Sequence, residues 1–362
     1  MPPVQLRGSI LFLNLYDVCE EIRMEELRHL LGLAPAGGKT SFRHPAPQYL
    51  GFERPPIVER LEETKLKTGT ALAGRLKYYD YGVLSVQFEL PFEGGWETLV
   101  ELSSRLVAGL EIEDQAFALV KEKSRRAAAA LIKPYEHWLS EDYYIIHVRE
   151  VEGAPRAADL LERYGEPIAQ IVRGENTALS DAERREILQS SMSYYPNDLA
   201  VVGWNAALIY DTDAGAEATI QLLEYANSQL LEFRHYDEIL TRQLNSAYQS
   251  LEKGTGWLGR WRLARVSARL YTLLLELTEL AERTDNSIKF LSDMYSARFY
   301  KLAATKVGVQ DYKELVHRKL GTAEGLYKFM VEQFHQGRGF VLELVVVIIL
   351  IIELVFLFRG KP

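Results

Sequence analysis

The residue types that most often carry chemistry are scattered along this chain rather than grouped. The seven histidines show no metal-ligand spacing; they are His29, His44, His137, His147, His235, His317 and His335. The glycines between residues 254 and 259 lie between two expected helices, without the strand that precedes a dinucleotide-binding loop. We therefore expect no catalytic residues, no metal and no cofactor. An enzyme whose active site carries no sequence signature remains the third alternative for the function.

Cys19 is the single cysteine of the chain, so no internal disulfide can form. A small, buried apolar side chain is a more common role for such a residue than a reactive thiol. We expect Cys19 to be part of a core.

A basic segment is the first feature that could bind a partner. No acidic residue lies between Glu252 and Glu276, whereas arginines and tryptophans gather there: Trp257, Arg260, Trp261, Arg262, Arg265 and Arg269. Such a patch suits RNA phosphate, a ribosome or lipid headgroups. The alternative is a solvated basic face that pairs with acids on a neighbouring helix.

The second feature is an apolar seam, with residues three and four positions apart, which is typical of packed helices. Its predicted interface residues are Leu223, Leu230, Phe233, Asp237, Leu240, Leu244 and Leu251. Asp237 is the one polar break, and a buried carboxylate needs a partner, for which we expect Arg265 or Arg269. The seam predicts a helical hairpin and a homo-oligomer.

The third feature is the apolar stretch 340–358, in which only Glu343 and Glu353 are polar. A helix of this length covers the ~30 Å hydrocarbon core of a bilayer. No signal peptide precedes it at the N-terminus. We therefore predict a single-pass C-terminal membrane anchor, with the lipid bilayer as a partner and the remainder of the chain in the cytoplasm.

The elements that must position these residues begin with an α+β pattern. Apolar runs and helical periodicity alternate as strand, helix, two strands, helices and a strand, at 9–16, 20–33, 71–79, 83–92, 96–110, 114–131 and 143–151. Residues 80–82 are a hairpin turn between the two adjacent strands. The order predicts a ferredoxin-like βαββαβ domain.

A second stretch adds further α/β elements before the helices begin. Ser180 and Glu183 form a capping box at a helix start, and residues 199–210 are an expected strand. The predicted division is a ferredoxin-like domain at 1–152, a βααβ segment at 153–214, a helical hairpin stalk at 215–336 and a transmembrane helix at 340–358.

Composition limits the class of protein. The chain has 362 residues, 48% hydrophobic and 25% charged, which is ordinary for a globular protein. Its formal net charge of −8 argues against general affinity for nucleic acid, although a local basic patch can still bind phosphate.

Four segments carry a resemblance to a known family: 223–240, 283–286, 315–320 and 325–327. Together with the C-terminal apolar stretch, they resemble the family of proteins required for meiotic nuclear division, also called domain of unknown function 155. The resemblance implies a homo-oligomeric membrane protein that supports translation by anchoring ribosomes, with no enzymatic activity. The chain has no transit peptide, so it resembles a bacterial-type member, which implies a bacterial inner membrane.

We therefore expect a membrane-anchored, homo-oligomeric scaffold or tether that presents an α/β body. The alternative is an RNA- or ribosome-binding tether that uses the segment 260–269. We identify no small-molecule substrate from the sequence.

Overall fold

The computed structural model describes residues 4–33, 50–52, 55–65, 71–107, 111–252, 265, 267–268, 270–272, 274–278, 288–290 and 294–359. The chain divides into two compact units. The α/β unit is formed by Met1–His235 and Glu282–Tyr312, and the helical unit by Tyr236–Ala281 and Lys313–Pro362.

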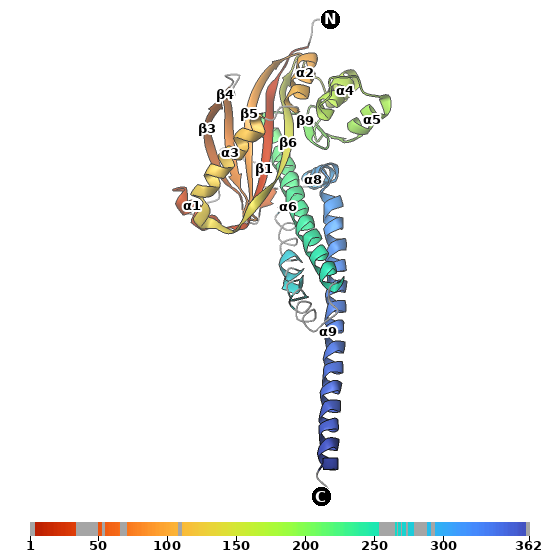
Figure 1. Ribbon diagram of the computed structural model, residues 1–362. Helices are drawn as coiled ribbons and strands as arrows, with labels where there is room; N and C mark the ends of the chain where they lie inside the picture. The colour runs from red at the N-terminus through yellow and green to blue at the C-terminus, as the bar shows by residue number, and fades with distance from the viewer. Residues whose placement is uncertain are drawn as a thin grey trace. The chain divides into compact units, whose positions relative to one another are not determined.

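The α/β unit is built on an eight-stranded sheet (Figure 1) with the order β3-β4-β5-β1-β6-β9-β8-β7. Its strands are β1 (Leu6–Ile22), β3 (Ile57–Lys65), β4 (Ala71–Tyr78), β5 (Val83–Gly94), β6 (Leu131–Val151), β7 (Ser191–Met192), β8 (Leu199–Val202) and β9 (Ala206–Tyr210). Neighbouring strands are antiparallel except β6 and β9, which are parallel. The long strands β1 and β6 form the middle of the sheet.

Both faces of β1 are buried, which explains why its sequence is almost continuously apolar. Ile10, Phe12 and Tyr16 contribute to the main apolar core on one face. Because side chains alternate along a strand, the intervening residues point to the opposite face. Those residues include Leu13 and the carboxylate of Asp17, both buried.

Five helices belong to the side of the sheet that carries the main core (Figure 1): α1 (Met24–Leu30), α2 (Trp96–Val107), α3 (Glu111–Arg126), α4 (Ala157–Arg173) and α5 (Asp181–Gln189). Half of the predicted capping box is present at the start of α5: the Glu183 amide donates to the Ser180 hydroxyl at 3.3 Å, whereas the Glu183 carboxylate lies 3.7 Å from Arg173. The opposite face is covered by the first part of α6 (Asp213–Glu252), as the contacts described below show.

The predicted hairpin at residues 80–82 is confirmed between β4 and β5. Gly82 has a φ of +97°, and a Cβ there would lie 1.7 Å from the carbonyl oxygen of Cys19. The Gly82 carbonyl accepts from the amide of Val18 at 3.1 Å. Only glycine suits this turn, because the backbone of β1 passes directly against it.

The ferredoxin-like plan predicted from the sequence is wrong, because the sheet has eight strands in one layer. Strand β3 was not predicted, because its sequence is rich in charged residues such as Glu59, Arg60 and Glu62. Charged residues are common on a strand at the edge of a sheet, where β3 lies. The expected strand at 199–210 is two strands, β8 and β9, separated by a turn at Trp204.

Two further elements of the α/β unit follow α6 in the chain. A short strand, β10 (Ile288–Phe290), pairs antiparallel with β2 (Leu50–Phe52), within the stretch 215–336 that was predicted to be a helical hairpin. Helix α8 (Met294–Lys306) comes next and leads through a turn at Gly308 into α9 (Val309–Arg359).

The helical unit has a small core of its own. Three segments contribute to this core: α6, the helical residues described between 265 and 278, and α9. Its buried residues are Leu244 and Ala247 of α6, Leu270 and Leu274 of the middle segment, and Ala323, Leu326 and Met330 of α9. This packing accounts for the apolar periodicity of the corresponding segments.

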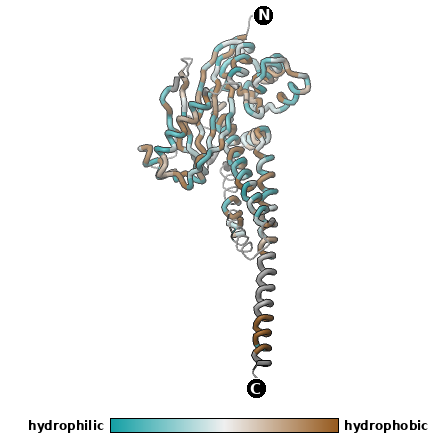
Figure 2. The backbone as a smooth tube through the Cα atoms, viewed as in Figure 1, coloured by the Kyte–Doolittle hydropathy of each residue, from teal (hydrophilic) through white to brown (hydrophobic). Residues whose placement is uncertain are grey.

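The predicted transmembrane helix at 340–358 is wrong. These residues do belong to α9, but no helix in the described part of the chain is both long enough and apolar enough to cross a membrane. Between Glu332 and the C-terminus, the side chains described are those from Val346 to Val355, a run that includes Glu353 (Figure 2). The predicted C-terminal anchor and the membrane location derived from it are therefore not supported.

Candidate functional site

A layer of buried polar side chains lies between α6 and the sheet. The ammonium group of Lys77, on β4, pairs with the carboxylate of Glu224, on α6, and both side chains are almost inaccessible. One turn further along α6, the Ser228 hydroxyl hydrogen-bonds to the Tyr81 hydroxyl at 2.7 Å. Tyr81 also packs edge-to-face on Tyr225. These contacts fix both the position and the rotation of α6 on the sheet.

A second ionic group of this layer surrounds Asp17. Its Oδ2 lies 3.0 Å from Nδ1 of His235, and the ring of Tyr135 stacks on the His235 ring with centroids 4.4 Å apart. Burial raises the pKa of Asp17 well above its ordinary value, and a hydrogen bond with Glu232 opposes the shift. Burial also raises the pKa of the Cys19 thiol, to about 12, so the thiol stays protonated, as expected for a core cysteine.

This polar layer is suited to structural specificity rather than to chemistry on a soluble substrate. Lys77, Asp17 and Glu224 are each at most 5% exposed. A buried charge is tolerated when it is paired, and its removal leaves the partner unpaired in a medium of low dielectric constant. The layer therefore selects one register of α6 against the sheet.

A cavity of about 180 Å³ lies at the first turns of α6, against the sheet. Four neighbouring strands, β4, β5, β1 and β6, form its floor, and α6 supplies one wall. Arg149 is held there by three hydrogen bonds: to Ser9 Oγ at 2.9 Å, to Glu89 Oε1 at 2.8 Å and to Asp213 Oδ1 at 2.5 Å. Burial disfavours the charge of Arg149, but these carboxylates outweigh it and raise its pKa.

His147 lines the same cavity and is 2% exposed. Its Nε2 lies 2.9 Å from the carbonyl oxygen of Asp211. A carbonyl only accepts, so Nε2 carries the proton and Nδ1 carries a lone pair when the ring is neutral. Burial lowers the pKa of His147, against the opposing hydrogen bond to Asp211. The nearest carboxylate oxygen, Asp213 Oδ1, is 3.8 Å from Nδ1, beyond hydrogen-bonding distance.

Arg75 and Glu217 complete the charged lining of this cavity. Nε of Arg75 donates to Gln87 at 2.9 Å, and Glu217 accepts from Gln221 at a marginal 3.5 Å. Arg75 and Glu217 form no ion pair with each other. Because Asp213, Glu217 and Gln221 are four residues apart, they share one face of α6.

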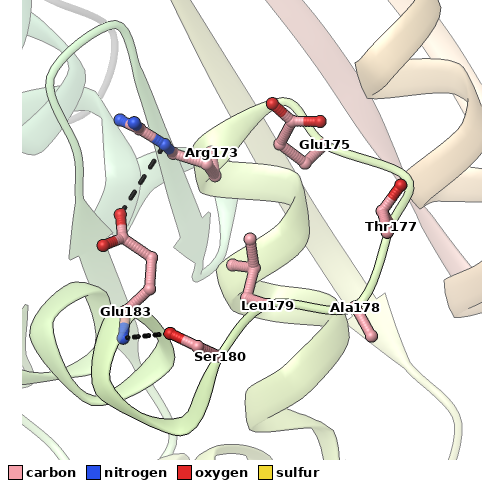
Figure 3. A pocket seen from close by; sticks show the side chains of 7 residues that line it. All are labelled: Arg173, Glu175, Thr177, Ala178, Leu179, Ser180 and Glu183. Carbon is pink, nitrogen blue, oxygen red and sulfur yellow. Dashed lines mark hydrogen bonds and ion pairs between the residues drawn. The ribbon is translucent and has the colours of Figure 1, made fainter.

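A second, shallower depression of about 340 Å³ lies at the loop between α4 and α5 (Figure 3). Its charged groups serve the loop itself. Arg173 Nε lies 3.7 Å from Glu183 Oε1, and the Glu183 amide donates to Ser180. We assign no function to this depression.

The predicted seam residues fall in both units. Leu223, Leu230 and Phe233 are buried in the part of α6 that belongs to the α/β unit. In the helical unit, Leu240 and Leu244 are buried and Leu251 packs against the small core.

Asp237 pairs with a lysine of α9 rather than with the expected arginines. Its Oδ1 lies 2.5 Å from Nζ of Lys319, which also donates to the Thr241 hydroxyl at 2.6 Å. Arg265 is exposed, and Arg269 lies outside the described residues.

Most of the other predicted site residues lie outside the residues that the structure describes. Of the basic patch, Trp257, Arg260, Trp261 and Arg262 are not described. The side chain of Glu343 is not described either, whereas Glu353 is exposed on α9. The interpretation of the patch as an RNA, ribosome or lipid site therefore stays a prediction.

Exposed apolar residues form the clearest surface feature of the helical unit. Val346 to Leu350, Ile351, Ile352, Leu354 and Val355 are each between 47% and 57% exposed. They occupy successive positions and therefore every side of α9. Phe329, also on α9, is 47% exposed.

The sequence reasoning missed the cavity residues Arg75, His147 and Arg149. They are separated by up to 74 positions and lie on β4 and β6, which are not neighbours in the sheet. The available signal was weak: charged residues in strands whose other residues are apolar.

Fold and site together define an α+β protein with a two-sided eight-stranded sheet, a buried polar layer under α6 and a separate helical unit. The chain belongs to the family described as "Uncharacterized protein MJ0711, N-terminal domain", whose profile matches residues 7–217, more than half of the chain. This finding overturns the resemblance to the meiotic nuclear division family, which the comparisons do not support.

One relative is "Uncharacterized protein MJ0711" of Methanocaldococcus jannaschii, which is 20% identical over 189 residues. The similarity covers 52% of this chain and 58% of the relative, so the chain spans little more than half the length of that protein. No solved structure matches the chain.

Proposed function

We propose that this protein is a homo-oligomeric scaffold whose copies join through the apolar segment Val346–Val355 of α9. The observation that supports the proposal is the exposure of this segment, in which every residue except Glu353 is apolar and about half exposed. A helix that is apolar on all sides is stable in water only when other chains or elements cover it.

A second copy of the chain is the simplest cover, because it brings an identical apolar segment. One partner helix covers a single stripe, so a bundle of several copies removes more of this surface from water. Burial of apolar surface stabilises by about 25 cal/mol per Å². The α/β units are then presented in several copies by one assembly, which is the property that defines a scaffold.

The test is the mass of the full-length protein, measured by sedimentation velocity in a mild non-ionic detergent that suppresses unspecific aggregation. We expect a species larger than the 41.3 kDa chain. Ile349→Asp and Ile351→Asp place a charge on nearly opposite sides of α9, since two residues are about 200° apart. At least one of them should shift the mass to that of a monomer.

The matched control is Thr322→Asp, which adds the same charge at an exposed position earlier on α9. This variant should keep the mass of the unmodified protein. A monomeric full-length chain, or an oligomer that survives both isoleucine substitutions, would refute assembly through this segment.

The alternatives have less support among the described residues. An RNA- or ribosome-binding role rests on the segment 257–269, of which little beyond the exposed Arg265 is described. No reaction is part of the proposed function.

A further inference from the structure

The cavity at the start of α6 carries an inference that is independent of self-association. It is lined by two arginines, three carboxylates and one histidine, on four strands and one helix. A charged side chain that has no ion-pair partner within the protein can bind an oppositely charged group of a ligand. The charges that are not paired within the protein determine which ligand the cavity can bind.

Three of the charges satisfy one another. Arg149 uses its Nε, Nη1 and Nη2 on Asp213, Ser9 and Glu89, so its guanidinium is engaged on all three nitrogens. The two carboxylates Glu89 and Asp213 are its ion-pair partners, at 2.8 and 2.5 Å. This group forms a hydrogen-bonded edge of the cavity, in which the single cation is already paired with two carboxylates.

Two side chains of opposite charge in this cavity, Arg75 and Glu217, have no ion-pair partner among the described residues. Arg75, on β4, is bound only through Nε, to the neutral side chain of Gln87, so its two Nη groups keep their donors. Glu217, on α6, accepts one long hydrogen bond from the neutral Gln221. Neither belongs to any ion pair among the described residues.

His147 adds a hydrogen-bond acceptor to the same cavity. Its Nε2 proton is committed to the carbonyl of Asp211, and burial lowers its pKa, so Nδ1 presents a lone pair on the cavity wall. A ligand that fits the lining therefore offers an anionic group to Arg75 and a cationic hydrogen-bond donor to Glu217 and His147.

The volume limits the size of this ligand. At about 180 Å³, the cavity is smaller than the pockets of roughly 300–1,000 Å³ that hold drug-sized ligands, so it suits a smaller molecule. An α-amino acid with a small side chain has about this size and carries both charges on adjacent atoms. Its carboxylate matches the planar guanidinium, and its ammonium offers three donors.

We propose that this cavity binds a small zwitterion of the α-amino acid class, with its carboxylate on Arg75 and its ammonium on Glu217 and His147. The site is distinct from the apolar segment of α9 and requires no oligomer. Most of its residues come from the stretch 7–217 that defines the family.

The test is ligand-observed saturation-transfer NMR on the full-length protein, with L-alanine as the probe. Propionate lacks the ammonium of alanine, and ethylamine lacks its carboxylate. Comparing their affinities with that of alanine therefore measures how much each charged group contributes to binding. We expect alanine to give a saturable signal and to bind at least tenfold more tightly than either analogue. No signal for alanine, or equal affinity for propionate, would overturn the proposal.

Two variants assign the binding to this cavity. Arg75→Gln and Glu217→Gln should each weaken alanine binding at least tenfold, and Arg75→Lys should keep part of it. The matched control is Arg7→Gln, an exposed arginine of β1 whose partners Glu93 and Glu150 lie outside the cavity. Alanine binding that is unchanged in both cavity variants, with circular dichroism confirming their folding, would place the ligand elsewhere and refute the site.

Discussion

Single residues under α6 show how strongly the sheet and the helix depend on each other. The Lys77–Glu224 pair joins residues 147 positions apart, and both side chains are almost completely buried. The pKa of Tyr79 is raised well above its ordinary value by burial, with Glu224 adding to the shift, so this carboxylate lies among groups that stay neutral. We therefore expect the stability of the α/β unit to be sensitive to substitution of either partner of this pair.

Lys77→Met tests this dependence. The substitution leaves Glu224 as a buried carboxylate without its cation, which costs about 3–5 kcal/mol in comparable cases. Denaturant unfolding followed by circular dichroism should show a loss of this size. The double variant with Glu224→Gln removes both charges and should recover more than half of the loss. A loss below about 1 kcal/mol in Lys77→Met would mean that the pair contributes little.

His147 predicts a pH dependence of stability. Burial lowers its pKa, so the unfolded chain binds a proton more readily than the folded chain does. The stability that neutral His147 contributes is present above about pH 6.5 and is lost as the pH falls from there through the folded-state pKa. The expected slope within this window is at most about 1.4 kcal/mol per pH unit.

The measurement compares unfolding free energies of the protein and of His147→Gln between pH 5 and pH 7.5. Glutamine keeps a donor near the position of Nε2 but does not titrate. The unmodified protein should lose stability relative to the variant as the pH falls. His29→Gln, an exposed histidine on α1, is the control. A difference that is constant with pH would show that His147 titrates alike in both states.

At the scale of elements, the β4–β5 hairpin is held by one glycine. Gly82 has a positive φ and leaves no room for a Cβ beside the carbonyl of Cys19. The turn therefore joins the hairpin to the central strand β1 through the contact between Gly82 and Val18.

Gly82→Ala should destabilise the α/β unit by more than about 2 kcal/mol, because strain and a steric clash add together. Gly153→Ala separates the two causes. Gly153 also has a positive φ, +83°, but its Cβ position is open. This control should lose only about 1 kcal/mol in thermal or denaturant unfolding. Equal losses in the two variants would contradict the close approach of β1.

At the scale of the whole molecule, the two units have separate cores, and the exposed apolar surface is concentrated on α9. Glu353 is the one charged residue in the described apolar run. If several copies cover this run, the carboxylate leaves water in the assembly, which is unfavourable.

Glu353→Gln should therefore strengthen self-association. A gain of about 1.4 kcal/mol corresponds to a tenfold lower dissociation constant. Sedimentation at a series of concentrations measures the shift, with Glu324→Gln, at an exposed position of the same helix, as the control. Weaker association in Glu353→Gln would show that the carboxylate makes a favourable contact between copies.

The sequence alone determined the features that depend on neighbours in the chain. The hairpin at residues 80–82, the helix cap at Ser180 and the long helices were predictable because turn, capping and helical periodicity act within a few residues. Apolar content alone was misleading at the C-terminus. It led to the prediction of a membrane anchor at 340–358, which the described part of the helix does not support.

Only the tertiary structure decided the order of the eight strands and the contents of the polar layer. Lys77 and Glu224, or Arg75 and Glu217, are far apart in the chain, and no local pattern links them. Their proximity follows from the packing of α6 on a sheet whose strand order is set by long-range pairing. A buried charge finds its partner through the fold, and for that reason the candidate site was invisible in the sequence.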